Sequence, residues 1–199
     1  MLEHDFVLGW SNIWKQPYVG MSGGYSRHAH AVGTTNGAGA HNLQLFVLAP
    51  DGTVLHALPG FWHPEDLARE LRFAKVAARL WEDDTRTRAQ KDRMLVRLHL
   101  AEIRRQSPET YARSGWQDFD ERTERARAQR EARDTVLTNA LGEIIGMKPL
   151  NVLAHERVLQ QPFVPFTEFD IGRFVDYGTL YYDLNQGRDH ARVLPRAGS

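Results

Sequence analysis

Cysteine is absent from this chain of 199 residues. Its absence excludes disulfides, thiolate nucleophiles and thiolate-bound metal sites, but it leaves the cellular compartment open. No apolar run approaches the roughly 20 residues that a membrane-spanning helix needs. The opening residues also lack the basic segment that begins a signal peptide. We therefore expect a chain that is soluble as written and whose localisation is undetermined.

An excess of either charge is also missing, because 25 basic residues balance 25 acidic ones. Without a global positive field, binding to nucleic acid or to an acidic membrane surface is disfavoured. The chain is 42% hydrophobic, and its length suffices for one ordinary core with an appendage or for two small domains. We expect a partner, if there is one, to be another protein or a second copy of the chain.

The stretch "HNLQLFVLAPDGTVLHALPGFWHPEDLARELRFA", residues 41–74, predicts strand, turn, strand, loop and helix. The apolar run after Gln44 indicates a strand buried on both faces, which is typical of a central strand. In the turn, Pro50 presets φ, Asp51 bonds its own backbone and Gly52 accepts a positive φ. The segment "TVLHAL" therefore returns antiparallel, and Pro64 starts an amphipathic helix with acidic residues in its first turn.

This strand–turn–strand–helix run, residues 43–80, resembles the C-terminal half of thioredoxin-like domains. "GAHNLQLFV" resembles the family's stretch before its central strand, with His41 in place of the cis-proline. "MLEHDFV" resembles the text after the first thioredoxin helix, so a dithiol motif would lie upstream of Met1. The resemblance implies an α/β fold: a partial or divergent thioredoxin-like sheet with flanking helices, without dithiol redox activity.

Changes in composition along the chain predict three regions. Residues 1–82 form the predicted thioredoxin-like domain and begin with a strand over residues 5–14. Residues 83–146 form a predicted helical arm, with a helix before Gln106 and a charged, solvated helix or extended arm over residues 118–134. Residues 147–199 form an aromatic, proline-containing C-terminal extension, which we expect to lie across a surface of its own chain or of a partner.

Histidine is the main transition-metal ligand available here, and "RHAH" places His28 and His30 two residues apart. In an extended loop both side chains can face one ion, and His41, His56 or His63 could complete the site. Copper and zinc are the metals that this set suits. The alternative is a pair of loop histidines bonded to backbone or water, and no other cofactor is expected.

Motifs for enzymatic chemistry are missing. The glycine-rich loop of residues 32–42 precedes a strand instead of opening a helix and lacks a Lys-Ser/Thr ending, so it predicts a tight loop with positive φ. No serine lies in a Gly-x-Ser-x-Gly elbow. Asp51 belongs to a turn, and Glu65 and Asp66 belong to a helix N-terminus. We therefore expect a protein without catalytic residues.

Aromatic residues suggest where a protein partner would bind. Core positions are predicted for Trp10 and Trp81. The candidate interaction residues lie in the loop "PGFWHP" and the C-terminal extension, and they are Phe61, Trp62, Phe163, Phe166, Phe169, Phe174, Tyr181 and Tyr182. The leading hypothesis is a non-catalytic module for protein interaction or homo-oligomeric assembly. The alternatives are a copper- or zinc-binding protein and a fragment of a thioredoxin-like oxidoreductase.

Overall fold

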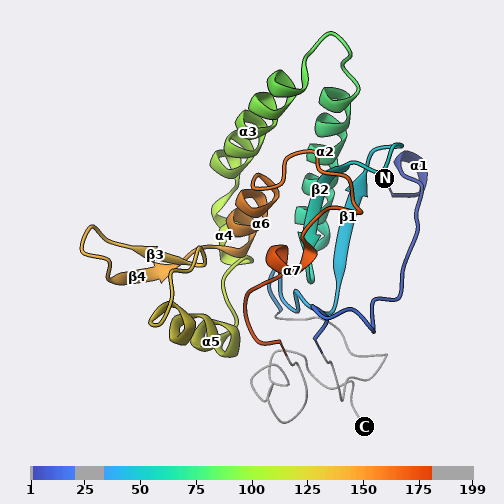
Figure 1. Cartoon of the computed structure of the whole chain (residues 1–199). Helices are drawn as coiled ribbons and strands as arrows, with labels where there is room; N and C mark the ends of the chain where they lie inside the picture. The colour runs from blue at the N-terminus through green and yellow to red at the C-terminus, as the bar shows by residue number, and fades with distance from the viewer. Residues whose placement is uncertain (1, 21–33, 181–199) are drawn as a thin grey trace.

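The computed structural model describes residues 2–20 and 34–180 and shows a mixed α/β fold (Figure 1). The strands form two separate antiparallel hairpins, β1–β2 and β3–β4. The elements in chain order are α1 (Leu2–Asp5), β1 (Gln44–Leu48), β2 (Val54–Pro59), α2 (Pro64–Trp81), α3 (Arg88–Arg105), α4 (Pro108–Ala112), α5 (Asp118–Ala128), β3 (Val136–Thr138), β4 (Ile144–Met147), α6 (Leu150–Val158) and α7 (Ile171–Phe174).

The predicted hairpin is confirmed as β1 and β2. Gly52 has a φ of 84°, and Asp51 Oδ1 accepts a hydrogen bond of 2.9 Å from the Thr53 backbone N–H. The strands pair antiparallel, with Leu45 opposite Leu58. Every residue of β2 is buried. The turn chemistry alone therefore located this hairpin correctly.

Two strand predictions are wrong. Among the described residues β1 pairs only with β2, and most of its side chains are only half-buried, so it is not a central strand. The segment predicted as a strand over residues 5–14 has no regular structure after α1. Val7 and Trp10 there are 103% and 92% exposed, which also contradicts a core position for Trp10. A strand needs a neighbour to pair with, and none lies beside this segment in the described sheet.

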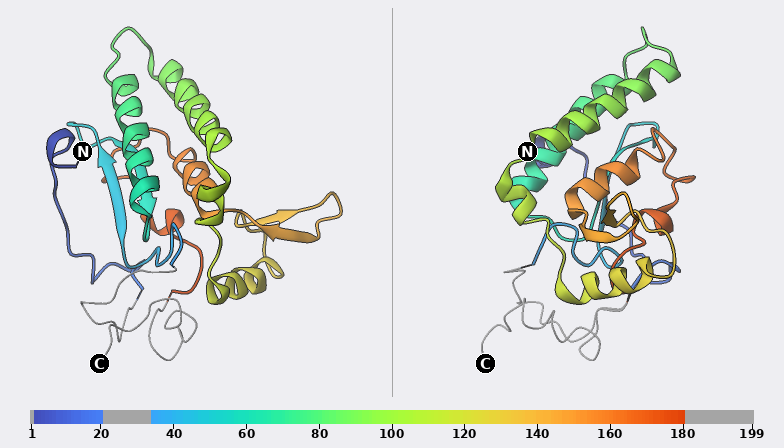
Figure 2. Two further views of the ribbon diagram at one scale, coloured as in Figure 1. Left: turned by 180° about the vertical axis from the view of Figure 1, so that it is seen from behind. Right: turned by 90° about the vertical axis from the view of Figure 1, so that its left-hand side faces the viewer.

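Helices α2 and α3 form an antiparallel pair, as both views of Figure 2 show. Helix α2 packs against β2, and α3 contacts α2 and α6. Pro64 occupies the first turn of α2 as predicted. Thr87 caps α3 through a reciprocal capping box with Gln90. A first-turn proline therefore marks the N-terminal end of α2, and a capping box marks that of α3.

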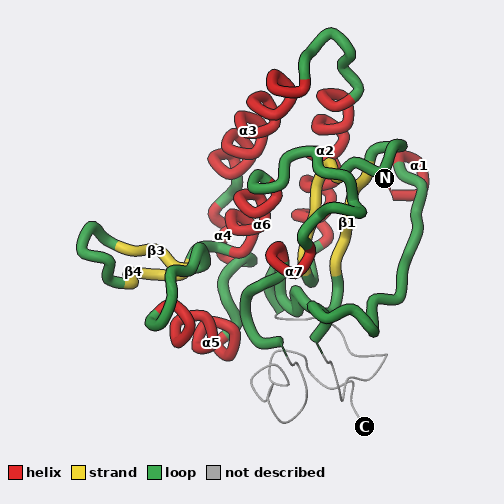
Figure 3. The backbone as a smooth tube through the Cα atoms, viewed as in Figure 1, coloured by secondary structure: helices red, strands yellow, loops and turns green. Residues whose placement is uncertain are grey.

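The range 83–146 contains the expected helices and also a hairpin that was not predicted. β3 and β4 project away from the helices as a separate arm (Figure 3). The charged helix α5 carries an ion pair between Arg125 and Glu121, one helical turn apart, at 2.7 Å. It is not solvated all round, because Phe119 and Glu124 are buried against the rest of the chain.

The C-terminal extension supplies part of the protein's own core. Helix α6 is buried on most of its surface, and Phe169, Phe174 and Tyr177 pack with Leu153 in one hydrophobic cluster. Phe163 packs in a second cluster with residues of α2 and α3. For the described residues, the extension therefore covers its own chain. Tyr181 and Tyr182 lie outside the described residues.

In the described part of the glycine-rich loop, Gly37 and Gly39 have positive φ, as predicted for a tight loop. Gly60, which precedes α2, also has positive φ and in addition has no room for a side chain. A Cβ on Gly60 would lie 2.3 Å from the Ala38 carbonyl oxygen, whereas one on Gly39 would meet nothing. We expect Gly60→Ala to lower the free energy of unfolding by about 2 kcal/mol more than Gly39→Ala, because both share the φ penalty and only one adds a clash. Urea unfolding of both variants measures this difference, and equal losses would contradict it.

Candidate metal centre

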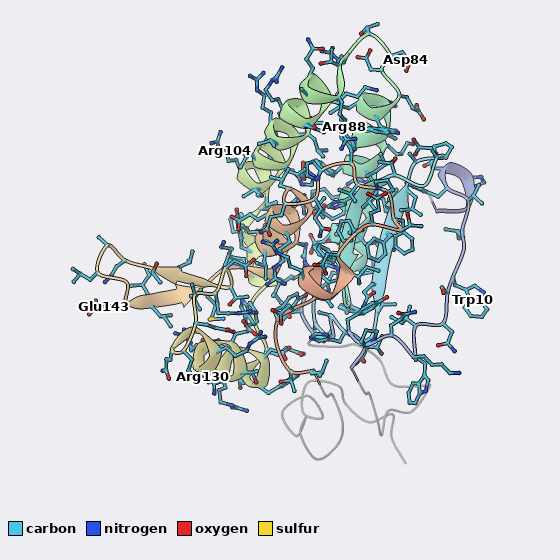
Figure 4. The ribbon with its side chains drawn as sticks, in the orientation of Figure 1. Trp10, Asp84, Arg88, Arg104, Arg130 and Glu143 are labelled. Atoms are coloured by element: carbon cyan, nitrogen blue, oxygen red, sulfur yellow. The ribbon has the colours of Figure 1, made fainter. Side chains whose placement is uncertain are left out.

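A cluster of buried ionisable side chains lies where four elements meet. His56 comes from β2, Glu70 from α2, His99 from α3 and His155 from α6. The four side chains are essentially inaccessible, with relative exposures of 0–1%. By contrast, the charged residues labelled in Figure 4, such as Arg104 and Glu143, lie at the periphery of the molecule. Ionisable groups are almost never this deeply buried unless they are paired or bind a metal.

The four side chains are in direct contact with one another. The Glu70 Oε2 atom lies 3.0 Å from His56 Nε2 and 3.2 Å from His155 Nε2. On the other side of its ring, His155 Nδ1 lies 2.8 Å from His99 Nδ1. One nitrogen from each histidine can be chosen so that the three lie within 4.8 Å of one another. The histidines therefore form a compact group of three potential metal ligands beside one carboxylate.

Hydrogen bonding does not satisfy this cluster completely. The contact between His99 Nδ1 and His155 Nδ1 needs a proton on one of the two nitrogens only, because the other must accept it. Within the described residues, His56 Nδ1 and His99 Nε2 have no hydrogen-bond partner, although both are buried. His155 Nε2 has none either, although it lies 3.2 Å from Glu70 Oε2. Such orphaned buried atoms call for a physical explanation, such as a bound ion or water.

The surroundings favour the neutral forms of His56 and His99 and the ionised form of Glu70. Burial lowers the pKa of His56, although Glu70 partly offsets this effect. Burial, together with the charges of His155 and His56, lowers the pKa of His99 well below its ordinary value. Burial on its own would raise the pKa of Glu70, but attraction by His155 and the hydrogen bond with His56 outweigh it and lower that pKa. Neutral imidazole and carboxylate are the forms that bind metal ions.

One aromatic ring, that of Phe73, packs against all three histidines of the cluster. The ring of Phe73 contacts all three imidazoles, with centroid distances of 5.0 Å to His56, 4.5 Å to His99 and 5.3 Å to His155. The His56 and His155 rings stack at 5.2 Å. This apolar packing keeps water away from the histidines and strengthens any electrostatic interaction within the cluster.

The structure places the predicted metal residues elsewhere. The two ring nitrogens of His41 lie 2.9 Å from the Tyr18 carbonyl oxygen and 3.1 Å from that of Tyr177. His63 Nε2 lies 3.0 Å from the Thr34 carbonyl oxygen. His28 and His30 lie outside the described residues, so their role stays a prediction. Of the histidines considered from sequence, only His56 belongs to the buried cluster.

The predicted interaction residues have varied environments. Trp62 is buried and donates its indole N–H to the Pro59 carbonyl oxygen at 2.8 Å, and Phe61 is half-buried against His63. Phe163, Phe169 and Phe174 are buried in the chain's own core, whereas Phe166 is 38% exposed. An interaction role for these residues stays a prediction. The described part of the chain has no helix long and apolar enough to cross a membrane.

Comparison with known proteins gives no match to a protein-family model, to a curated protein or to a solved structure. The thioredoxin-like resemblance of residues 43–80 therefore stays a prediction. Function has to be argued from the chemistry of the buried cluster.

Proposed function

We propose that the chain binds one divalent transition-metal ion, with zinc as the best fit, through His56, His99 and His155. The observation that carries this proposal is the group of three buried imidazoles, one from each of three elements, gathered beside the buried carboxylate of Glu70. Imidazole and carboxylate ligands suit zinc, and the absence of cysteine removes the competing thiolate chemistry.

A metal explains the cluster better than a hydrogen-bonded core does. Burying three imidazoles and a carboxylate costs desolvation energy, and well-packed hydrophobic residues of similar volume often give equal or greater stability. The orphaned nitrogens of His56 and His99 increase that cost. An ion would give a neutral imidazole a strong ligand bond in place of a missing hydrogen bond.

The spacing of the polar atoms supports coordination. A tetrahedral zinc ion, with Zn–N bonds of about 2.0–2.1 Å, holds its ligand atoms about 3.3 Å apart. The contacts of Glu70 Oε2 with His56 and His155 are 3.0 and 3.2 Å long. Glu70 Oε2 therefore already lies at about this spacing from two of the histidines. For Glu70 to be the fourth ligand of one ion, the His99 ring, which contacts His155 Nδ1, has to turn toward the Glu70 side of the cluster.

The complete enclosure of the cluster favours a structural role for the ion. Catalytic zinc sites keep a coordination position open to substrate, whereas structural sites are closed by four protein ligands. Three histidines and Glu70 would close this site, and the ion would join β2 to α2, α3 and α6. The function that follows is a non-catalytic module stabilised by metal. The β1–β2–α2 order is compatible with a thioredoxin-like scaffold for such a module.

Competition for zinc with a chromophoric chelator tests this proposal on untagged, metal-free protein. We expect one tightly bound ion per chain, and we expect His99→Gln and His155→Gln to weaken its binding by at least about tenfold. His63→Gln is the matched control, because its ring bonds only to backbone. The double variant His28→Ala/His30→Ala tests the loop. If the loop variant loses the ion while both cluster variants keep it, the proposal is wrong.

A further inference from the structure

The proposed metal centre is closed to solvent, so an ion needs a route into it. All four side chains are buried, so an ion can enter only when one of the surrounding elements moves. Local opening of native proteins takes place where few buried apolar contacts hold an element. The element with the weakest packing is therefore the expected entry route.

Helix α3 is packed more weakly than the other three walls. It buries only Leu95 and His99 among its 18 residues, whereas α2 and α6 each bury seven residues and β2 buries all six. The opposite face of α3 is exposed and carries Arg93, Arg97 and Arg104. The fully buried contacts of α3 are therefore made by one apolar side chain, Leu95, and one candidate metal ligand, His99.

Hydrogen bonds tether both ends of α3 to the rest of the chain. Near the N-terminal end, Arg88 donates hydrogen bonds to the Pro162 and Phe163 carbonyl oxygens at 2.7 and 3.2 Å. At the C-terminal end, the Tyr111 hydroxyl donates to the Ile103 carbonyl oxygen at 2.8 Å. An opening that starts around Leu95 and His99 can thus stay local while the rest of the fold persists.

We propose that α3 is the gate of the metal centre: it opens locally to admit the ion, and coordination by His99 then holds it closed. This proposal rests on the proposed function, because it assumes that the cluster binds zinc. It adds that metal occupancy controls the order of one particular helix. The exposed surface of α3 would then report whether the ion is bound.

Hydrogen–deuterium exchange of the full chain, with and without one equivalent of zinc, tests the gate. We expect peptides covering residues 92–103 to exchange at least about tenfold more slowly with zinc, and α2 and α6 to change much less. If zinc binds stoichiometrically but protects all four elements equally, the gate is wrong and the metal site stands. If no zinc binds, the proposed function fails and the gate fails with it.

Zinc release supplies a second test with a matched pair of substitutions. Leu95 on α3 and Leu153 on α6 are both fully buried, but they belong to different hydrophobic clusters. We expect Leu95→Ala to release zinc to excess chelator at least about tenfold faster than Leu153→Ala, since only the first loosens the gate. Equal acceleration would show that release follows global unfolding, which would overturn the proposal.

Discussion

Zinc should raise the melting temperature of the metal-free chain by about 5–10 °C at a free concentration about 100 times its Kd. Linkage at that concentration stabilises the folded state by about 2.7 kcal/mol if the unfolded chain does not bind the ion. Each kcal/mol shifts the melting temperature of a chain of this size by about 2–4 °C. Differential scanning calorimetry over a series of zinc concentrations measures the shift.

The same experiment on variants separates the buried cluster from other zinc ligands. His155→Gln should abolish the shift, because His155 contacts both Glu70 and His99. His41→Gln should keep the shift, because both ring nitrogens of His41 lie at backbone carbonyl oxygens and outside the cluster. A shift that survives in His155→Gln and disappears in His41→Gln would place the ion outside the cluster.

Asp66→Ala should lower the free energy of unfolding by about 3 kcal/mol, because the buried Asn36 and Thr110 side chains lose the acceptor of their hydrogen bonds and the partly exposed Arg113 loses its ion pair. Asp66 is 1% exposed and joins three parts of the chain. It accepts hydrogen bonds of 2.8 Å from Asn36, 2.9 Å from Thr110 and 2.8 Å from Arg113. The sequence pattern indicated only a position at the N-terminus of α2 for Asp66, so its contacts with Asn36, Thr110 and Arg113 were not predicted.

Asp66 should also make the free energy of unfolding depend on pH in the acidic range. Burial alone would raise the pKa of Asp66, but hydrogen bonds from Arg113, Asn36 and Thr110 lower it from 3.8 to about 2. A depressed folded-state pKa stabilises the protein above the unfolded-state value, and this stabilisation is lost as the pH falls toward 2. The contribution is about 2 kcal/mol and disappears between about pH 5 and pH 2.

Urea unfolding at several pH values measures both effects of Asp66. The control is Glu121→Ala, which removes the half-exposed ion pair of Glu121 with Arg125 and should change stability little. In Asp66→Ala the loss of stability at low pH should be smaller than in the wild type, because the group that titrates is gone. Identical pH profiles for the two variants would contradict the role given to Asp66.

The parts of the fold that local chemistry specifies could be predicted from sequence. Asp51 and Gly52 define the β1–β2 turn, and Pro64 defines the start of α2. The β3–β4 arm was missed, because strands of three and four residues leave little periodic signal. The segment over residues 5–14 has strand-forming composition but no pairing partner in the described sheet, and composition cannot supply one.

The candidate site was mostly beyond the reach of sequence patterns. His56, His99 and His155 are separated by more than 40 residues each, and tertiary packing alone brings them together. Glu70 did carry a usable signal, because it lies on the same helical face as Leu67, Leu71 and Ala74, where an acid is unexpected. The prediction relied instead on close spacing in the sequence and selected His28 and His30.

X-ray absorption at the zinc edge, on protein loaded with one equivalent of zinc, tests the central claim most directly. The metal-centre account predicts three imidazole ligands and one carboxylate oxygen at about 2.0–2.2 Å, because His56, His99, His155 and Glu70 form the site. A variant with His28 and His30 replaced should give the same spectrum. A bound zinc ion with fewer than three imidazoles, or a spectrum that changes in the loop variant, would contradict it.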